Sequence, residues 1–494
     1  MVKRFRIYPP VCSALGAAFC YYAPDIALWF GLPLIALVSL FRVLRAFPAM
    51  VSRDLKNTRL FREISLHLAA LAMGFSLGFA AHRAVPGPPR LGLQEEEIAG
   101  LTGKLKDDPR GLADGRGMAL LDLENAAGKA GLRASAAGEV LVFFPDEALP
   151  RLRDFGRGSR LYIEGGFLPP AKGNSAPVFQ AEGVHILKAA PAPERLRAGI
   201  RLGIIEKFGP HAWGGLAAAL LLGVKDSLET ELATSFRDSG CSHVLALSGI
   251  HLAVVSALIA FLLKKPLGLK AAAILGAALI LLYAGLVGPL PSLGRAVIMY
   301  LLGTLAVLGA FPRRPAVLLA LAFVIQLCLS PASGSSLSFI LSYLALAGIL
   351  ALGEPVHGLL GMTPEVLSRP LAASVGAFIA TAGVSAAFFG VLRPVGIIAG
   401  LVIVPLTTVF MILAMSYLGA AFLFPLLAGP LGTALSLLYQ ALSWIADMAG
   451  QVPGIETSSP LPVLAASLLV SAALILVWKL RSEKGNRLAP FAAA

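Results

Sequence analysis

Residues 461–480, LPVLAASLLVSAALILVWKL, carry a single charged side chain, Lys479, in twenty consecutive positions. An α-helix needs about 20 predominantly apolar residues to cross the hydrocarbon core of a bilayer. Inside lipid every backbone polar group must be paired within the protein, and a helix achieves this within one segment. The stretch therefore predicts a membrane-spanning helix.

Similar apolar runs recur along the chain, which has 494 residues and is 57% hydrophobic but only 14% charged. They lack the strict alternation of a membrane β-barrel, so the predicted fold class is a polytopic α-helical membrane protein. The N-terminal runs are about 10–23, which is short for a full span, 25–41 and 64–82. The later predicted spans are about 243–263, 271–288, 293–311, 315–330, 336–352, 371–391, 396–424, 431–449 and 461–480.

A polar stretch, residues 86–195, follows the third hydrophobic segment. Segments of β-propensity separated by turn residues predict five strands in it, and five strands in about 100 residues suit a small OB-like β-barrel. The predicted strands are 98–105, 117–124, 138–144, 159–167 and 177–187. The expected divisions of the chain are a membrane anchor of two to three helices (1–85), the β domain (86–195), an interfacial helix (194–208), a transmembrane domain (210–480) and a basic tail (481–494).

The interfacial helix is predicted from the spacing of apolar residues in 194–208. Leu196, Ile200, Ile204 and Phe208 share one helical face, and arginines occupy the other. Such a segment lies on a bilayer rather than through it.

The net charge of +13 does not by itself indicate a nucleic-acid ligand. Residues 86–195 hold fourteen Lys and Arg against fifteen Asp and Glu, so the excess lies in the membrane regions. There it follows the ends of spans, as the positive-inside rule requires. The basic loop 42–62, the pairs Lys264–Lys265 and Arg313–Arg314, and the residues after the last span are all expected to be cytoplasmic. Both termini are then cytoplasmic, and the β domain is extracytoplasmic.

The stretch SGCSHVLALSGIHLAVV (239–255) places two histidines and a Ser-Gly pair in an otherwise apolar run. On one continuous helix His243 and His251 would be about 12 Å apart along the axis, too far to bind one metal ion. They either hydrogen-bond to neighbouring helices or line a polar interior. In the second case Ser248 and Gly249 break the helix or allow a partner backbone to approach closely.

Three further positions are candidates for a polar pathway. Arg295 begins a strongly apolar run and must either snorkel or face water. Asp226 lies in a charged patch that is also typical of an ordinary solvated loop. Ser342 lies in a serine-rich stripe that packing of small residues between helices explains equally well. The sequence contains no P-loop, no nucleophile elbow and no metal-ligand spacing. Neither enzymatic activity nor a metal or other cofactor is predicted.

Residues 219–255, ALLLGVKDSLETELATSFRDSGCSHVLALSGIHLAVV, resemble the start of the competence domain of ComEC-type proteins. The family signature is LLLGD, a charged stretch and then SG-x-x-H-LL-A-x-SG-x-H. The matching positions are Gly223, Asp226, Gly240, His243, Ala246, Ser248, Gly249 and His251. Residues 282–299, LYAGLVGPLPSLGRAVIM, resemble a second family segment through Tyr283, Ser292, Arg295 and Ala296. The β domain is similar to the OB-like domain that precedes the competence domain.

The resemblance implies an inner-membrane channel that conducts single-stranded transforming DNA into the cytoplasm during natural competence. The alternative is a polytopic transporter or scaffold of the same fold that conducts another solute or none. The candidate pore-lining residues are Asp226, His243, Ser248, Gly249, His251, Arg295 and Ser342. The implied partners are single-stranded DNA, the lipid bilayer, a DNA-receptor protein outside, a helicase or strand-binding protein inside, and a second copy of the chain in a homo-oligomer.

The sequence departs from the family pattern in three places. Ile340 replaces the glutamine of a Phe-Gln-Leu-Ser-Phe segment, and Ser330 replaces a common acid. Many members carry a C-terminal metallo-β-lactamase-like domain regarded as a nuclease, whereas here the chain ends at Ala494, shortly after the last predicted span. Any nuclease is therefore expected to be a separate protein.

Overall fold

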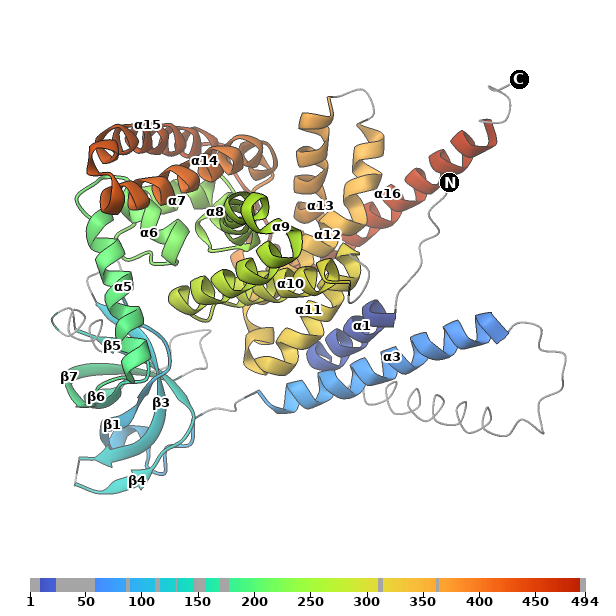
Figure 1. Cartoon of the computed structure of the whole chain (residues 1–494). Helices are drawn as coiled ribbons and strands as arrows, with labels where there is room; N and C mark the ends of the chain where they lie inside the picture. Colours follow the sequence, from blue (N-terminus) through green and yellow to red (C-terminus); the bar gives the residue numbers. More distant parts are fainter. Residues whose placement is uncertain are drawn as a thin grey trace, which may run out of the picture.

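The structure is a computed structural model in which a β domain lies beside a larger set of helices (Figure 1). It describes residues 9–23, 58–85, 89–111, 116–129, 131–145, 147, 156–168, 177–309, 314–360 and 364–488. Side chains are described in all of these except 58–65, 110 and 481–488. The predicted span at about 25–41 and most of the basic loop 42–62 lie outside the described residues.

The β domain is a closed five-stranded barrel. Its strands run in the order β1-β6-β7-β5-β3, and β3 pairs with β1 to close the ring. Of the strand pairs that the structure describes in this domain, β5 and β7 alone are parallel. The strands are β1 (Ile98–Leu105), β3 (Gly117–Gly128), β5 (Glu139–Phe144), β6 (Arg160–Leu168) and β7 (Val178–Lys188), with the short strands β2 (Arg110–Gly111) and β4 (Arg133–Ser135) added beside β3. The OB-like barrel and its five predicted strands are confirmed; β2 and β4 were not predicted.

Every second side chain along the strands fills the barrel interior. In β5 the side chains of Val140, Val142 and Phe144 are buried, while their neighbours in sequence are partly exposed. A strand with this period places one set of side chains on one face, here the interior. Phe179 from β7 and Leu161 from β6 complete the same core.

The remaining described chain is mostly helical. Its helices are α1 (Pro9–Tyr22), α3 (Thr58–Arg83), α5 (Ala192–Phe208), α6 (Gly214–Leu222), α7 (Thr230–Asp238), α8 (Ser242–Leu245), α9 (Gly249–Val287), α10 (Pro291–Val307), α11 (Pro315–Leu329), α12 (Leu337–Leu359), α13 (Glu365–Phe389), α14 (Val395–Leu423), α15 (Pro425–Gly450) and α16 (Pro460–Leu488). Six of them, α9 and α12–α16, are long and apolar enough to cross a bilayer. The chain is a multi-pass membrane protein, as predicted.

Two of the predicted spans are helices too short to cross a bilayer core, and the last helix extends beyond its predicted end. The helices α10 and α11 have 17 and 15 residues. At 1.5 Å per residue they reach only about 22–26 Å, less than a bilayer core of about 30 Å. At the other end of the domain, α16 continues to Leu488, so residues 481–488, predicted to be part of a tail, prolong the last helix.

The helix α9 consists of two halves that fold back on each other. Gly268 has φ +74°, ψ 173°, which is outside the helical region and is sterically easy only for glycine. A Cβ placed on Gly276 would lie 3.6 Å from Cγ2 of Ile259, whereas a straight helix would separate these positions by about 26 Å. The halves correspond to the predicted spans 243–263 and 271–288, and the pair Lys264–Lys265 lies near the turn.

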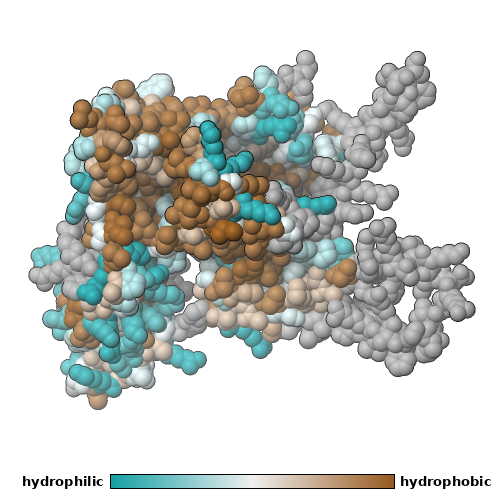
Figure 2. All heavy atoms as spheres, viewed as in Figure 1, coloured by the Kyte–Doolittle hydropathy of each residue, from teal (hydrophilic) through white to brown (hydrophobic). Residues whose placement is uncertain are grey.

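The helices expose large apolar side chains, while the barrel surface is mostly hydrophilic (Figure 2). Leu426 is 94% exposed, Val366 is 83% exposed and Phe261 is 79% exposed. Exposed apolar surface on this scale is unusual for a soluble monomer and is typical of a protein that contacts lipid.

The predicted interfacial segment is the helix α5, which connects the barrel to the membrane helices (Figure 1). Leu196 and Ile200 are exposed, as expected of an apolar face on a bilayer, but Phe208 is buried in the helical core. Two of the arginines on the other face do not point into open solvent, whereas Arg195 is exposed. Arg197 and Arg201 contact the barrel and the end of α9.

The N-terminal helix α1 packs closely against α3 and reaches the loop between α11 and α12. The hydroxyl of Tyr21 donates a hydrogen bond of 2.6 Å to the carbonyl oxygen of Pro331. The hydroxyl of Tyr22 donates one of 2.8 Å to the carbonyl oxygen of Gly334. These bonds attach the start of the described chain to the middle of the membrane domain.

Candidate functional site

The helix that the 239–255 stretch would form is broken in the structure. The short helix α8 ends at Leu245, and α9 begins at Gly249 after extended residues. Ser248 is the N-cap of α9: its Oγ accepts a hydrogen bond from the backbone N–H of Ile250. His251 completes a reciprocal cap, because its Nδ1 accepts the backbone N–H of Ser248 at 3.1 Å. The Ser-Gly pair thus marks a helix start.

His251 is left with one unused donor. Since Nδ1 is an acceptor in this cap, the neutral ring carries its proton on Nε2. The His251 side chain is 2% exposed, and Nε2 has no hydrogen-bond partner among the described residues. Buried polar atoms without partners are rare in proteins. The atom therefore indicates a place where an acceptor outside the described chain could bind.

Gly249, the first residue of α9, lies against Arg295 of α10. A Cβ built on Gly249 would be 2.9 Å from Nη2 of Arg295. Any larger residue would displace the guanidinium group or the helix. The sequence suggested that a partner backbone approaches the Ser-Gly pair closely. In the structure an arginine side chain does so.

Arg295 is buried between helices, and none of the acidic side chains that the structure describes pairs with it. Its side chain is largely enclosed, with 8% of the residue exposed. Nε donates a hydrogen bond of 2.8 Å to Oγ of Ser342 in α12, and the guanidinium carbon lies 5.9 Å from the centre of the Tyr343 ring. Among the described residues, the one hydrogen bond of Nη1 is to the sulfur of Met299, at 3.9 Å. Within the described chain no carboxylate is within ion-pair distance of Arg295, and Nη2 has no acceptor.

A second set of polar groups extends the cluster to α11. The hydroxyl of Tyr343 donates to Oε1 of Gln326 at 2.8 Å, and Nε2 of Gln326 donates to the carbonyl oxygen of Pro291 at 2.7 Å. Ser292, next to Pro291, donates to the carbonyl oxygen of Leu247 at 2.6 Å. These bonds join the starts of α9 and α10 to α11 and α12.

Sequence reasoning did not identify Gln326 or the hydroxyl of Tyr343 as members of this cluster. The available signal was a lone glutamine in the apolar run of α11, because a buried amide in such a run needs partners. We name the set Ser248, Gly249, His251, Arg295, Gln326, Ser342 and Tyr343 the Arg295 cluster.

Two of the predicted site residues lie apart from the hydrogen bonds of the Arg295 cluster. His243 is in α8 with an exposed side chain; it is on a different helix from His251 but near enough to interact with it electrostatically. Asp226 is half-buried in the loop between α6 and α7. Neither residue makes any of the hydrogen bonds that hold the cluster together. The structure thus brings together Ser248, Gly249, His251, Arg295 and Ser342.

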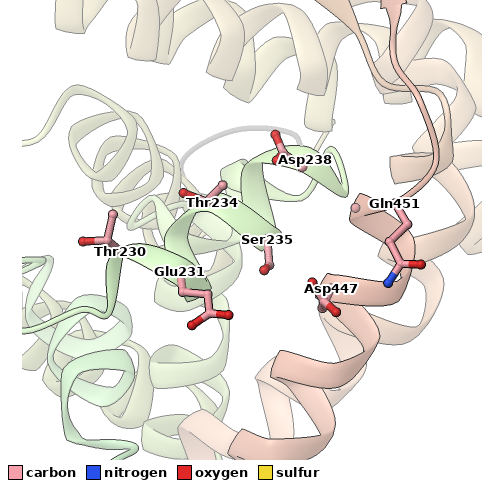
Figure 3. Close-up of a pocket in the computed structure, with 8 residues that line it drawn as sticks. Thr230, Glu231, Thr234, Ser235, Asp238, Asp447 and Gln451 are labelled. Atoms are coloured by element: carbon pink, nitrogen blue, oxygen red, sulfur yellow. The ribbon is translucent and has the colours of Figure 1, made fainter.

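A separate polar cavity of about 330 Å³ lies between α7 and α15 (Figure 3). It is lined by Thr230, Glu231, Thr234, Ser235, Asp238, Asp447, Gly450 and Gln451. Asp238 is already paired with Arg393, whose Nη2 lies 3.0 Å from its Oδ1. Since Glu231 and Asp447 add negative charge, a polyanion would be repelled here. Across the described residues there is no group of three or more His, Cys, Asp or Glu side chains placed to hold a metal ion.

Comparison with known proteins places this site within a matched family region. Residues 220–483, more than half of the chain, match the family described as "Competence protein". A segment of 137 residues, 26% of the chain, is 31% identical to ComE operon protein 3 of Bacillus subtilis (strain 168) and covers 17% of it. A segment of 279 residues, 56% of the chain, is 28% identical to an uncharacterized protein of Aquifex aeolicus (strain VF5) and covers 64% of it. The chain thus spans less than two thirds of either relative.

Proposed function

Because this chain belongs to the competence protein family, we propose that it is a membrane channel that conducts single-stranded DNA into the cytoplasm. Arg295 is the residue that we expect to contact the DNA backbone. The other members of the Arg295 cluster position this side chain or line the path beside it.

The observation that carries the proposal is a buried arginine that has no acidic partner in the described part of the chain. Arg295 lies between apolar helices, 8% exposed, and its polar contact is the neutral Ser342. An uncompensated buried charge costs several kcal/mol. Ionisable groups at membrane depth are therefore rare, and they commonly mark the path of a substrate or ion. A guanidinium with a free donor edge is suited to bind a phosphate group.

The free donors of the cluster match the chemistry of a nucleic-acid backbone. Nη2 of Arg295 and Nε2 of His251 both lack acceptors in the described chain. A phosphodiester supplies oxygen acceptors and one negative charge at every nucleotide. Single-stranded DNA can be held without regard to sequence through such backbone contacts.

The small number of charges in the Arg295 cluster favours conduction of DNA over tight binding of DNA. A conducting path must bind its substrate firmly enough to admit it and weakly enough to release it. The described cluster contains one permanent cation, Arg295, among neutral groups. A dense ring of arginines would hold a polyanion too tightly to conduct it.

The proposal is tested by DNA uptake in cells that carry Arg295→Ala or Arg295→Lys in place of the wild-type chain. We expect Arg295→Ala to lower the uptake of labelled DNA by about tenfold or more, since one lost charge-assisted contact is worth about 1.5–3 kcal/mol. Arg295→Lys retains the charge but not the planar donor edge, so an intermediate uptake is expected.

The matched control is Arg369→Ala, which removes an arginine of α13 that is 60% exposed and pairs with Glu365. It should transform like the wild type. Immunoblots and thermal unfolding of each purified variant separate loss of transport from loss of protein. Normal uptake by a well-expressed Arg295→Ala variant contradicts the channel assignment and favours the alternative of a transporter or scaffold for another solute.

The partners and the orientation belong to the same proposal. A DNA-receptor protein on the outside and a helicase or strand-binding protein on the inside would deliver and pull the strand. The barrel would face the outside, and both termini would face the cytoplasm.

A further inference from the structure

A cluster of charged side chains joins the barrel, α5 and the end of α9. Arg197 of α5 donates through Nη2 to Oδ1 of Asp108 in the barrel and through Nε to Glu194 at 2.8 Å. Arg201, one turn later, lies 3.3 Å from Oδ2 of Asp108. Arg157 of the barrel holds the other oxygen of Glu194 at 2.5 Å. Two carboxylates thus lie between three arginines.

The same arginines bind the carboxyl end of α9. Nη1 of Arg197 donates to the carbonyl oxygen of Leu286 at 3.3 Å, and Nη1 of Arg201 donates to this oxygen at 3.2 Å and to that of Val287. The last carbonyl groups of a helix have no partners within the helix, and they form the negative end of its dipole. Arg197 and Arg201, which belong to α5, therefore cap the carboxyl end of α9.

These contacts are enclosed, unlike ordinary surface ion pairs. The side chains of Arg197 and Arg201 are 9% and 13% exposed, and that of Asp108 is 26% exposed. Burial alone would raise the pKa of Glu194, but hydrogen bonds and charge from Arg157 and Arg197 outweigh it and lower this pKa below its ordinary value of 4.5. Glu194 therefore stays ionised at neutral pH and holds the two arginines in place.

The end of α9 is also close to the Arg295 cluster along the chain. Only Gly288, Pro289 and Leu290 separate Val287 from the first residue of α10, and Arg295 is in the second turn of that helix. Since α9 folds back at Gly268, its two ends lie together. Leu252, from the first half of α9, packs in one apolar cluster with Val287 and with Leu293 of α10.

We propose that Asp108, Arg197 and Arg201 are positioning residues that fix the barrel to the end of α9 and, through the turn to α10, hold Arg295 against Gly249. We name these three residues the barrel latch. The effect on DNA uptake rests on the proposed channel function. The mechanical link between the barrel and the α9–α10 turn does not.

The link is tested by hydrogen–deuterium exchange of the purified full chain in lipid nanodiscs. We expect Asp108→Asn to raise the exchange rate of amides in residues 284–298 by about tenfold, because a buried cap and its ion pair no longer hold this turn closed. Arg201→Gln, which leaves the barrel sequence untouched, should give the same result. If Asp108→Asn also destabilises the barrel, Arg201→Gln still tests the link, because its substitution lies in α5.

The matched control is Glu139→Gln. Glu139 pairs with Lys106 in the same barrel, and its side chain is 27% exposed, close to the 26% of Asp108. Its loss should leave exchange in residues 284–298 unchanged. Unchanged exchange there in both latch variants, or an equal rise in the control, overturns the inference.

The uptake assay then separates the two proposals. If the chain conducts DNA, Asp108→Asn and Arg201→Gln should lower uptake, and Glu139→Gln should not. Faster exchange with unaffected uptake supports the latch and counts against a role for Arg295 in transport. Lower uptake with unchanged exchange rejects the latch and leaves the channel proposal intact.

Discussion

Gly249 leaves room for the guanidinium group of Arg295. A substitution of Gly249 tests this contact between two residues without removing the charge of Arg295. Gly249→Ala adds one Cβ at 2.9 Å from Nη2. Overpacking of this kind costs about 1–3 kcal/mol and is relieved here by moving the arginine. We expect lower DNA uptake at a normal protein level, measured with labelled DNA and immunoblots.

A control for this prediction lies in the same helix. A Cβ on Gly285 of α9 would meet nothing within 4 Å, so Gly285→Ala should leave uptake unchanged. If Gly249→Ala supports normal uptake, the contact with Arg295 does not matter for transport.

The sequence identified five of the seven Arg295 cluster residues, because serine, glycine, histidine and arginine stand out in an apolar run. It grouped them as lining one pore but did not predict the hydrogen bonds between them. The bonds of Gln326 to Tyr343 and to Pro291 depend on how α11 packs between α10 and α12. That packing is a tertiary property, and no spacing within one helix reveals it. His243 shared the same motif, but the helix break places it on α8.

At the scale of elements, the start of α9 depends on the cap made by Ser248 and His251. Ser248→Ala removes the oxygen that accepts the N–H of Ile250. Loss of such a cap costs about 1 kcal/mol, whereas asparagine caps a helix as well as serine. We expect Ser248→Ala to lower the thermal unfolding midpoint of the purified protein and Ser248→Asn to restore most of it. Equal midpoints for all three proteins would show that the cap contributes nothing to stability.

The elements themselves were largely predictable. The β-propensity of the strand segments, the turn residues between them and the apolar runs of the helices are local signals, and the five barrel strands and the described membrane helices follow them. The turn within α9 also has a local signal, because Lys264, Lys265, Pro266 and Gly268 separate its two apolar halves. The strands β2 and β4 have two and three residues, and the pairing partner β3 rather than local propensity defines them.

For the whole molecule, the orientation in the membrane is the property to establish. The pair Lys264–Lys265 lies near the turn of α9, whereas the ends of α9 lie at the barrel side. Basic loops remain in the cytoplasm, so the barrel should be outside. We expect protease added to spheroplasts to cleave within 86–195 and to spare 42–62. The reverse pattern, a protected barrel and a cleaved 42–62 loop, would invert this topology.

The bonds from α1 to the loop after α11 constrain how this protein is made. Tyr21 and Tyr22 reach carbonyl groups of Pro331 and Gly334, which the ribosome adds some 310 residues later. Chains emerge N-terminus first at about 5–20 residues per second. Roughly 15–60 seconds therefore pass between the synthesis of these tyrosines and that of their acceptor carbonyl groups. During this interval the first helix is held only by its local neighbours. Its final docking is therefore a late event of biogenesis, after insertion of the segments that lie between.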